Sequence, residues 1–238
     1  MDFRARKKRA AVAVAAAGVD GLLVTHLPDV RYLCGFTGSS AALVLARGGA
    51  TLFTDGRYTA QAKAEAKGTR VVIAKKPAVT AACEWVETAG IRRCGFDAAQ
   101  TTVAALEAMR KAVSTRVRRG MFVSVGSLIA RLREVKDSDE VALMRSAANL
   151  GCRLFDGMLD YLEPGLRELA VAAELEHAAR LAGAEAMSFD TIVASGERSA
   201  LPHGRASMAK LPKRGFVTLD FGVVLDGYCS DIDRKSVV

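Results

Sequence analysis

Two aspartates near the end of the sequence, Asp220 and Asp231, are the residues best suited to chemistry. The Asp226-Gly227 pair between them is a strong turn signal, so the sequence predicts a hairpin with strands over 216–220 and 228–232. Side chains alternate along a strand, and both carboxylates fall on one face if the connecting loop has an even number of residues. Neighbouring carboxylates repel each other and need protons, cationic partners or metal ions. Spacing alone leaves two interpretations open: a metal site, or two solvated turn aspartates.

The first half of the chain shows the alternating pattern of an α/β fold. Helices are expected near 3–17, 58–66, 79–89 and 102–112, with a helical turn at 29–33, and strands near 21–25, 41–46, 51–54, 70–74 and 93–96. Strands that alternate with helices are typical of a layered α/β domain. The segment Asp55-Gly56-Arg57 is expected to form a turn closed by a local ion pair.

The N-terminus has a basic run, residues 4–9, before an alanine- and valine-rich stretch, residues 10–17. Together they imitate the charged and apolar regions of a signal peptide. We favour an amphipathic first helix with a basic face, because the stretch is mostly alanine and a strand follows directly at Gly21.

A second domain is expected to begin near Lys136. Asp137 can cap a helix and Glu140 can complete a capping box, so a helix is predicted from here to about Tyr161. Its expected core contacts are Val141, Met144, Ala148, Leu154 and Phe155.

After the Pro164-Gly165 stop, a second helix is predicted over 168–182, with Arg167 as a weak cap. Residues 188–194 are expected to form a strand, and a polar loop follows. His203 lies in that loop, where a lone histidine is usually just exposed.

Several segments resemble the pita-bread metallopeptidases, specifically the aminopeptidase P and prolidase group that cleaves Xaa-Pro bonds. In the first half they are 27–33 (LPDVRYL), 35–40 (GFTGSS) and 53–58 (FTDGRY), which are similar to the creatinase-type N-terminal domain. In the second half they are 188–196 (SFDTIVASG), 199–204 (SALPHG), 220–222 (DFG) and 230–232 (SDI). The resemblance implies an α/β creatinase-like N-terminal domain over 1–135, followed by a truncated α+β pita-bread domain over 136–238.

The family site has five protein ligands, and the resemblance implies two of them here. Asp220 matches the ligand of one metal ion, and Asp231 matches the carboxylate that bridges both ions. His203 matches a catalytic histidine that contacts the substrate near the scissile bond. The remaining family ligands, one His and two Glu, would come after Val238, so we expect this chain by itself to bind metal weakly and to be inactive.

The implied activity is that of a metallopeptidase, an Xaa-Pro aminopeptidase or dipeptidase, which hydrolyses the bond before proline. Two divalent ions, expected to be manganese with cobalt or zinc as alternatives, would activate a shared water. The expected partners are a proline-containing peptide and, in the full-length protein, further copies of the chain. Two alternatives stay open: a noncatalytic pita-bread module that binds peptides or partners, and a metal-free creatinase-like hydrolase, against which the two aspartates argue.

Residues 233–238 depart from the family pattern, in which Thr-Arg and a further apolar strand follow the second aspartate. The same six residues result from translating a common sequencing adapter. We therefore expect the native sequence to stop at Ile232.

The composition, 50% hydrophobic and 25% charged residues, fits a soluble globular protein. No apolar run is long enough to span a bilayer. The net charge is +8, with basic clusters at 4–9 and at Arg116, Arg118 and Arg119. No aromatic residue interleaves these clusters and no nucleic-acid motif is present, so neither a nucleic acid nor a membrane is an expected partner.

The five cysteines are odd in number and never have CxxC spacing. This pattern favours a reducing cytosol and argues against a disulfide framework or a zinc ribbon. Cys229, between the two aspartates, is expected to lie in the core.

Overall fold

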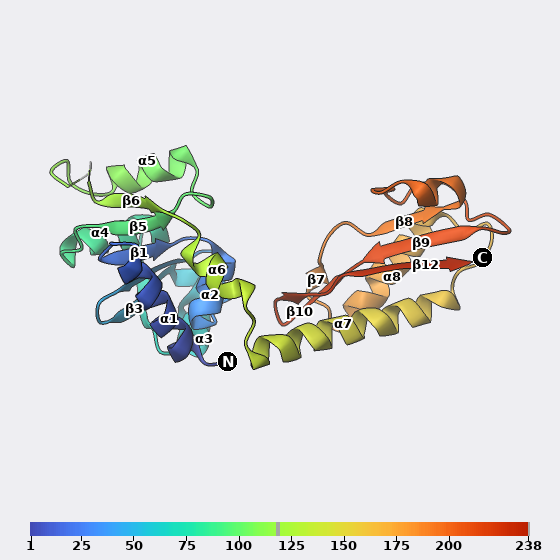
Figure 1. Ribbon diagram of the computed structural model, residues 1–238, viewed down its shortest axis with the longest axis horizontal. Helices are drawn as coiled ribbons and strands as arrows, with labels where there is room; N and C mark the ends of the chain where they lie inside the picture. Colours follow the sequence, from blue (N-terminus) through green and yellow to red (C-terminus); the bar gives the residue numbers. More distant parts are fainter. Residues whose placement is uncertain (118–119, 238) are drawn as a thin grey trace. The chain divides into compact units, whose positions relative to one another are not determined.

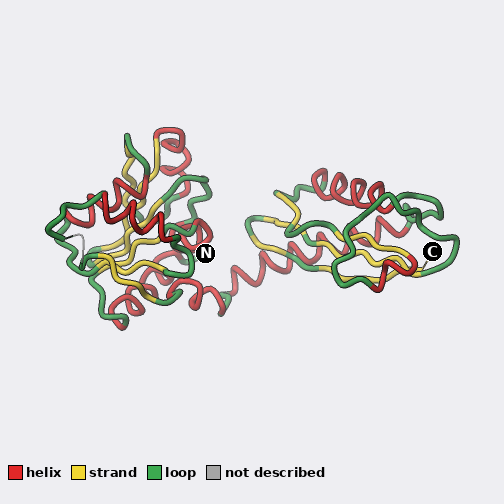
Figure 2. Tube along the Cα trace, turned by 90° about the horizontal axis from the view of Figure 1, so that it is seen from above, coloured by secondary structure: helices red, strands yellow, loops and turns green. Residues whose placement is uncertain are grey.

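A computed structural model describes residues 1–117 and 120–237 (Figures 1 and 2). The chain forms two compact units, one over Met1–Val135 and one from Lys136 onward. Arg118 and Arg119, two members of the second basic cluster, lie outside the described residues. Within the described part of the chain, no helix is both long and apolar enough to cross a membrane.

The first unit is built on a mixed sheet of six strands in the order β4-β3-β2-β1-β5-β6. The strands β1, β5 and β6 are mutually parallel, β3 and β4 are parallel, and β2 is antiparallel to β1 and β3. Their bounds are β1 Gly21–Val24, β2 Ala42–Ala46, β3 Gly49–Asp55, β4 Arg70–Ala74, β5 Cys94–Asp97 and β6 Phe122–Val125.

Helices cover both faces of this sheet (Figure 2). They are α1 Phe3–Ala16, α2 Leu27–Cys34, α3 Thr59–Glu65, α4 Ala78–Thr88, α5 Val103–Lys111 and α6 Leu128–Glu134, with a 3₁₀ turn η1 Gly56–Tyr58. Leu22 and Val24 of β1 pack with α1, α2 and α6, whereas Leu23 packs with α4 and α5. Because both faces are buried, the central strands β1 and β2 read as continuous apolar runs rather than alternating ones.

Most elements expected in the first unit are confirmed, but β6 and α6 were not anticipated from the sequence. The strand is only four residues long. The helix begins at Leu128, and the side chain of its N-cap residue, Ser127, makes no capping hydrogen bond. Neither element therefore has a clear local signal. The Asp55–Arg57 pair is confirmed, with Arg57 Nε donating to Asp55 Oδ1 at 2.9 Å.

The first helix is confirmed, but its expected basic face is wrong at Arg6, which is 1% exposed. The Arg6 guanidinium donates to the Tyr32 carbonyl at 3.2 Å and lies 4.4 Å from the centre of the Tyr32 ring. Lys7 Nζ donates to the carbonyls of Lys67 at 2.6 Å and Gly68 at 2.8 Å. These two cations anchor the helix to its own unit.

The second unit packs two helices against two three-stranded antiparallel sheets, β11-β10-β7 and β12-β9-β8 (Figure 1). The helices are α7 Ser138–Leu159 and α8 Glu168–Leu181, and a 3₁₀ turn η2 covers Gly196–Ala200. The strands are β7 Ala186–Met187, β8 Ile192–Ser195, β9 Phe216–Phe221, β10 Val223–Leu225, β11 Tyr228–Cys229 and β12 Ile232–Val237. Buried residues of both helices and of β9 form one core, among them Leu154, Leu175 and Leu219.

The capping box of α7 is confirmed. Asp137 Oδ1 accepts from the Glu140 amide at 2.9 Å, and Glu140 Oε2 accepts from the Asp137 amide at 3.0 Å. Two expected core contacts of this helix are wrong, because Val141 is 38% and Met144 is 37% exposed. Apart from Glu140, the buried stripe of the helix begins only at Ala147.

Three further expectations for the second unit need correction. Residues 188–191 are irregular, so the strand expected over 188–194 is only β8. The strand expected over 228–232 is divided into β11 and β12. Cys229 is exposed rather than buried, because it lies on the edge strand β11 while its neighbour Tyr228 turns inward and donates to Glu140.

Cysteine exposure differs between the units. Cys34, Cys83 and Cys94 of the first unit are buried, and Cys152 and Cys229 of the second are exposed. Burial raises the pKa of Cys34 to about 11 and that of Cys83 and Cys94 to about 12.

Candidate functional site

The strand β9 carries Asp220 on the side that faces away from the core. Val217, Leu219 and Phe221 are buried, whereas Thr218 and Asp220, which alternate with them, are half-buried. This alternation follows from the period of two along a strand. The sequence from 216 to 221 therefore fixes the face on which the Asp220 carboxylate lies.

The adjacent strand β12 brings a second carboxylate opposite the first. Asp233 pairs directly with Asp220 in the antiparallel register. Asp231 and Asp233 are both exposed, and Ile232 between them is 6% exposed. Because directly paired residues project to the same side of a sheet, Asp233 lies on the same side as Asp220, and Asp231, which directly precedes β12, is exposed nearby. Asp233 was not anticipated, because the sequence predicted that β9 would pair with 228–232.

The electrostatics agree with this clustering. Burial raises the pKa of Asp220, the negative charges of Asp233 and Asp231 raise it further, and His203 acts in the opposite direction. Like charges that share a site favour a proton or a bound cation. Asp231, Asp233 and His203 thus each lie close enough to Asp220 for their charges to act on it.

Gly222 makes the junction between the two aspartate segments possible. A Cβ on this residue would lie 2.0 Å from the Ser230 carbonyl oxygen. Across this contact, the Ser230 amide donates to the Val223 carbonyl at 2.9 Å and the Val223 amide donates to Ser230 Oγ at 3.0 Å. Only glycine permits so close an approach, which holds the chain just after Asp220 against the residue just before Asp231.

The turn predicted at Asp226-Gly227 is confirmed. Asp226 has a φ of 48° and Gly227 a φ of 72°, so both central residues adopt the positive angles of a type I′ hairpin turn. The turn joins β10 to β11, with Leu225 paired to Tyr228.

His203 is exposed in the loop between β8 and β9. The loop begins with η2, and the Arg205 amide donates to the His203 carbonyl at 2.9 Å. Glu168, at the start of α8, binds this loop, whereas from the sequence it was considered only as the start of a helix. The only sequence feature that could have indicated a further role is its position in the first turn after Arg167, which makes no side-chain capping hydrogen bond.

A metal ion would find suitable donor types in this cluster but few of them. Carboxylate oxygens suit hard divalent ions such as manganese. Among the residues that the structure describes, no group of three or more His, Cys, Asp or Glu side chains is arranged to hold a metal ion. The metal-ligand roles of Asp220 and Asp231 and the substrate role of His203 stay predictions.

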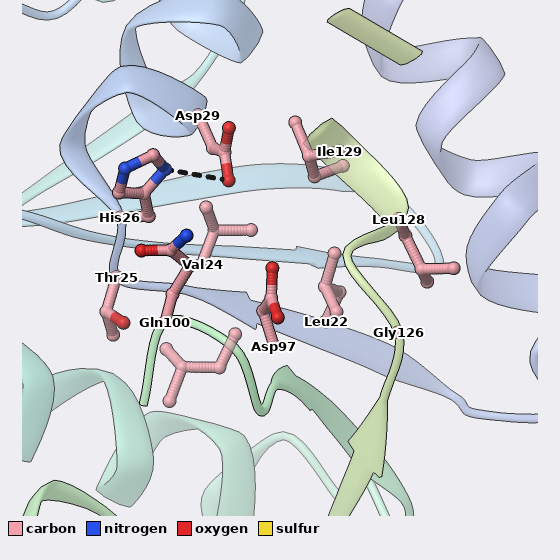
Figure 3. Close-up of a pocket in the computed structure, with 11 residues that line it drawn as sticks. Leu22, Val24, Thr25, His26, Asp29, Asp97, Gln100, Gly126, Leu128 and Ile129 are labelled. Atoms are coloured by element: carbon pink, nitrogen blue, oxygen red, sulfur yellow. Dashed lines mark ion pairs between the residues drawn. The ribbon is translucent and has the colours of Figure 1, made fainter. Parts of the chain in front are cut away.

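The first unit has a pocket of its own, at the carboxyl ends of β1, β5 and β6 (Figure 3). In it, His26 Nδ1 lies 3.1 Å from Asp29 Oδ2, and Arg133 Nη1 lies 2.7 Å from Asp29 Oδ1 outside the residues drawn. The pocket encloses about 20 Å³, which is room for a water molecule and not for a peptide. This pocket is therefore not a candidate site for a peptide substrate.

Comparisons with known families match both parts of the chain. Residues 6–135 match the creatinase/prolidase N-terminal domain, and residues 142–238 match metallopeptidase family M24. Among curated proteins, an uncharacterized peptidase of Bacillus subtilis, YqhT, is 39% identical over 93% of this chain and 62% of its own length. An Xaa-Pro dipeptidase of Pyrococcus horikoshii is 29% identical over 92% of this chain and 60% of its own length.

Solved structures give the same result. An Xaa-Pro dipeptidase from Bacillus anthracis is 35% identical with a TM-score of 0.91, over 98% of this chain and 64% of that one. An X-Pro aminopeptidase from Thermotoga maritima is 30% identical with a TM-score of 0.86, over 95% of this chain and 65% of that one. The chain thus spans between 60% and 65% of the length of these four relatives. The expected fold, an α/β N-terminal domain followed by part of a pita-bread domain, is confirmed.

Proposed function

Because the chain belongs to the creatinase/prolidase family, and within it to the prolidase and aminopeptidase P group of peptidases, we propose that the protein hydrolyses the peptide bond that precedes a proline residue. The observation that supports this most directly is that Asp231 and His203 both lie near enough to Asp220 for their charges to act on its pKa. This cluster lies within the residues that match metallopeptidase family M24. The proposal concerns the activity of the whole protein, and the chain spans 60–65% of the length of the relatives compared above.

Asp220 and Asp231 are the residues that we propose to hold two divalent ions. Manganese is the first candidate and cobalt or zinc are the alternatives, because oxygen donors suit hard or borderline ions. When bound, such ions supply a water of lowered pKa and polarise the substrate carbonyl. The raised pKa of Asp220 fits this role, since a cation would relieve the repulsion from Asp231.

His203 is the residue that we propose to bind the substrate beside the scissile bond. Its exposed position leaves the imidazole free to donate a hydrogen bond to a peptide carbonyl. The substrate would be a proline-containing peptide.

We further propose that the whole protein works as a homo-oligomer in the cytoplasm. The compartment is supported by five cysteines that are all free.

Metal binding can be tested on this chain without any activity. We expect Mn²⁺ to broaden the amide resonances of 219–221 and 230–233 with a dissociation constant on the order of 0.1–1 mM, as for sites with few ligands. Asp220→Asn should abolish the broadening, and Asp226→Asn, in the exposed turn, should leave it unchanged. Broadening that survives Asp220→Asn would contradict the assigned site.

Activity is tested by sequencing the gene past the codon for Ile232 and expressing the complete reading frame. We expect the frame to supply one His and two Glu ligands, and the product to cleave an Xaa-Pro dipeptide only with Mn²⁺ or a related ion. The 238-residue chain itself should be inactive. A complete frame that binds Xaa-Pro peptides without cleaving them would refute the peptidase proposal in favour of a noncatalytic binding module.

A further inference from the structure

Glu168 is a fully buried carboxylate outside the aspartate cluster. It is 0% exposed, and it occupies the first position of α8. Its Oε1 atom accepts from the Ser195 amide at 2.9 Å and from Ser195 Oγ at 3.0 Å. Ser195 is the last residue of β8, directly before the loop that carries His203.

The second oxygen of Glu168 binds the other end of the same loop. Its Oε2 atom accepts from the Ser207 amide at 3.1 Å and from Ser207 Oγ at 2.6 Å. It also accepts from Arg198 Nε at 3.2 Å. One carboxylate thus joins residues 195 and 207, which are the two ends of the segment around His203.

The base of this loop is closed by further contacts, and its tip is open. Arg198 Nη2 donates to the Arg205 carbonyl at 2.8 Å across the loop. The Leu169 amide donates to the Ser207 carbonyl at 3.0 Å. A Cβ on Gly204 would lie 3.0 Å from the Ala194 Cβ, so this glycine packs directly on β8. His203 itself remains exposed.

A buried charge is stable only if its surroundings compensate it. Burial alone would raise the pKa of Glu168, but hydrogen bonds from Ser207 and Ser195 and the charge of Arg198 outweigh burial and lower the pKa. The start of α8 also favours a negative charge. The carboxylate therefore stays ionised and keeps all of its donors at neutral pH.

We propose that Glu168 is a positioning residue, which clamps both ends of the 195–207 segment so that His203 is presented in one orientation. The assignment of His203 to substrate binding rests on the proposed function, whereas the clamp rests on the contacts of Glu168 alone. A surface loop carries a binding group accurately only when a fixed set of supporting contacts holds it.

The clamp is tested by hydrogen exchange on the 238-residue chain with Glu168→Gln. The amide keeps the shape of the carboxylate, but its NH₂ group would face donors from either Ser195 or Ser207. We expect exchange in 196–207 to become roughly tenfold faster, while β9 keeps its rate, because hydrogen bonds to a charged group are lost. Ser207→Ala, which removes one hydrogen bond to Glu168 and the one that Ser207 Oγ accepts from the Ala209 amide, should give a smaller increase of about threefold.

The matched control is Glu176→Gln, an exposed glutamate on the same helix, which should leave loop exchange unchanged. Unchanged loop exchange in Glu168→Gln, or an equal increase throughout α8 and β9, would overturn the clamp. The first result would mean that the contacts do not hold the loop, and the second that the residue only stabilises the whole unit.

The link to substrate binding is tested in the complete reading frame. We expect Glu168→Gln to lower kcat/KM about tenfold without changing Mn²⁺ broadening. Adding His203→Ala to Glu168→Gln should lower kcat/KM little further. Independent, additive losses would overturn the positioning role. If the unaltered protein has no peptidase activity, the proposed function fails, and the exchange experiment still decides whether Glu168 holds the loop.

Discussion

Gly222→Ala should damage the second unit far more than an ordinary glycine substitution. The added Cβ would lie 2.0 Å from the Ser230 carbonyl oxygen and 2.9 Å from its carbon. These are backbone atoms, which cannot rotate away as a side chain can. The Ser230 segment must therefore retreat by about 1 Å, since non-bonded carbon and oxygen atoms need roughly 3 Å.

The cost follows from the contacts that this retreat breaks. Two hydrogen bonds link Val223 and Ser230, and each contributes about 1 kcal/mol. Forcing an extra methyl group into a packed junction adds about 1–3 kcal/mol. We therefore expect a loss of about 3–5 kcal/mol, which lowers the Tm of a unit of this size by roughly 12 °C or more.

Calorimetry measures this loss as a shift of the second unit's transition. The fluorescence of Trp85, the one tryptophan of the sequence, follows the unfolding of the first unit, whose Tm should not change. Gly157→Ala in α7 is the matched control, because nothing lies within 4 Å of its added Cβ. It should stabilise the helix by up to about 1 kcal/mol. A second-unit Tm for Gly222→Ala within a few degrees of the unaltered protein would refute the reasoning.

Three more predictions concern single contacts. The pKa of Glu168 is lowered in the folded protein, so its stabilisation of the second unit is complete above the pKa of an unfolded glutamate, about 4.3, and is lost as pH falls through the lower folded pKa. The Tm of the second unit should therefore start to fall through this group only below about pH 4.3, and its dependence on pH should be weaker in Glu168→Gln. Asp137→Ala removes the cap of α7 and should destabilise the second unit by about 1 kcal/mol in urea melts followed by circular dichroism, whereas an unchanged midpoint would contradict the cap. Arg133→Met leaves Asp29, whose side chain is 4% exposed, without its guanidinium and should destabilise the first unit by about 2 kcal/mol in Trp85 fluorescence melts, with Asp29→Asn/Arg133→Met less affected than Arg133→Met alone.

Features that depend on neighbours in sequence were predictable. The α7 capping box joins Asp137 to Glu140, and the hairpin turn needs only Asp226 and Gly227. Both follow from local backbone chemistry, which short sequence patterns record. The alternation that turns Asp220 away from the core is local in the same way.

Features that depend on distant partners were not predictable. Glu168 meets Ser207, which is 39 residues away, and Arg6 meets Tyr32, which is 26 residues away. The register that places Asp233 opposite Asp220 depends on β9 pairing with β12 rather than with the strand that follows the turn. No single-sequence pattern records such pairings, because the energy comes from tertiary packing.

The unequal burial of the cysteines gives the protein an internal reporter of unfolding. A thiol reagent at neutral pH should react with Cys152 and Cys229 in the native state, since both are exposed. The three thiols of the first unit are buried and their pKa values are raised, so they react only when that unit opens. Pulse labelling followed by mass spectrometry would therefore read the opening of the first unit alone, in an unmodified chain and without a probe.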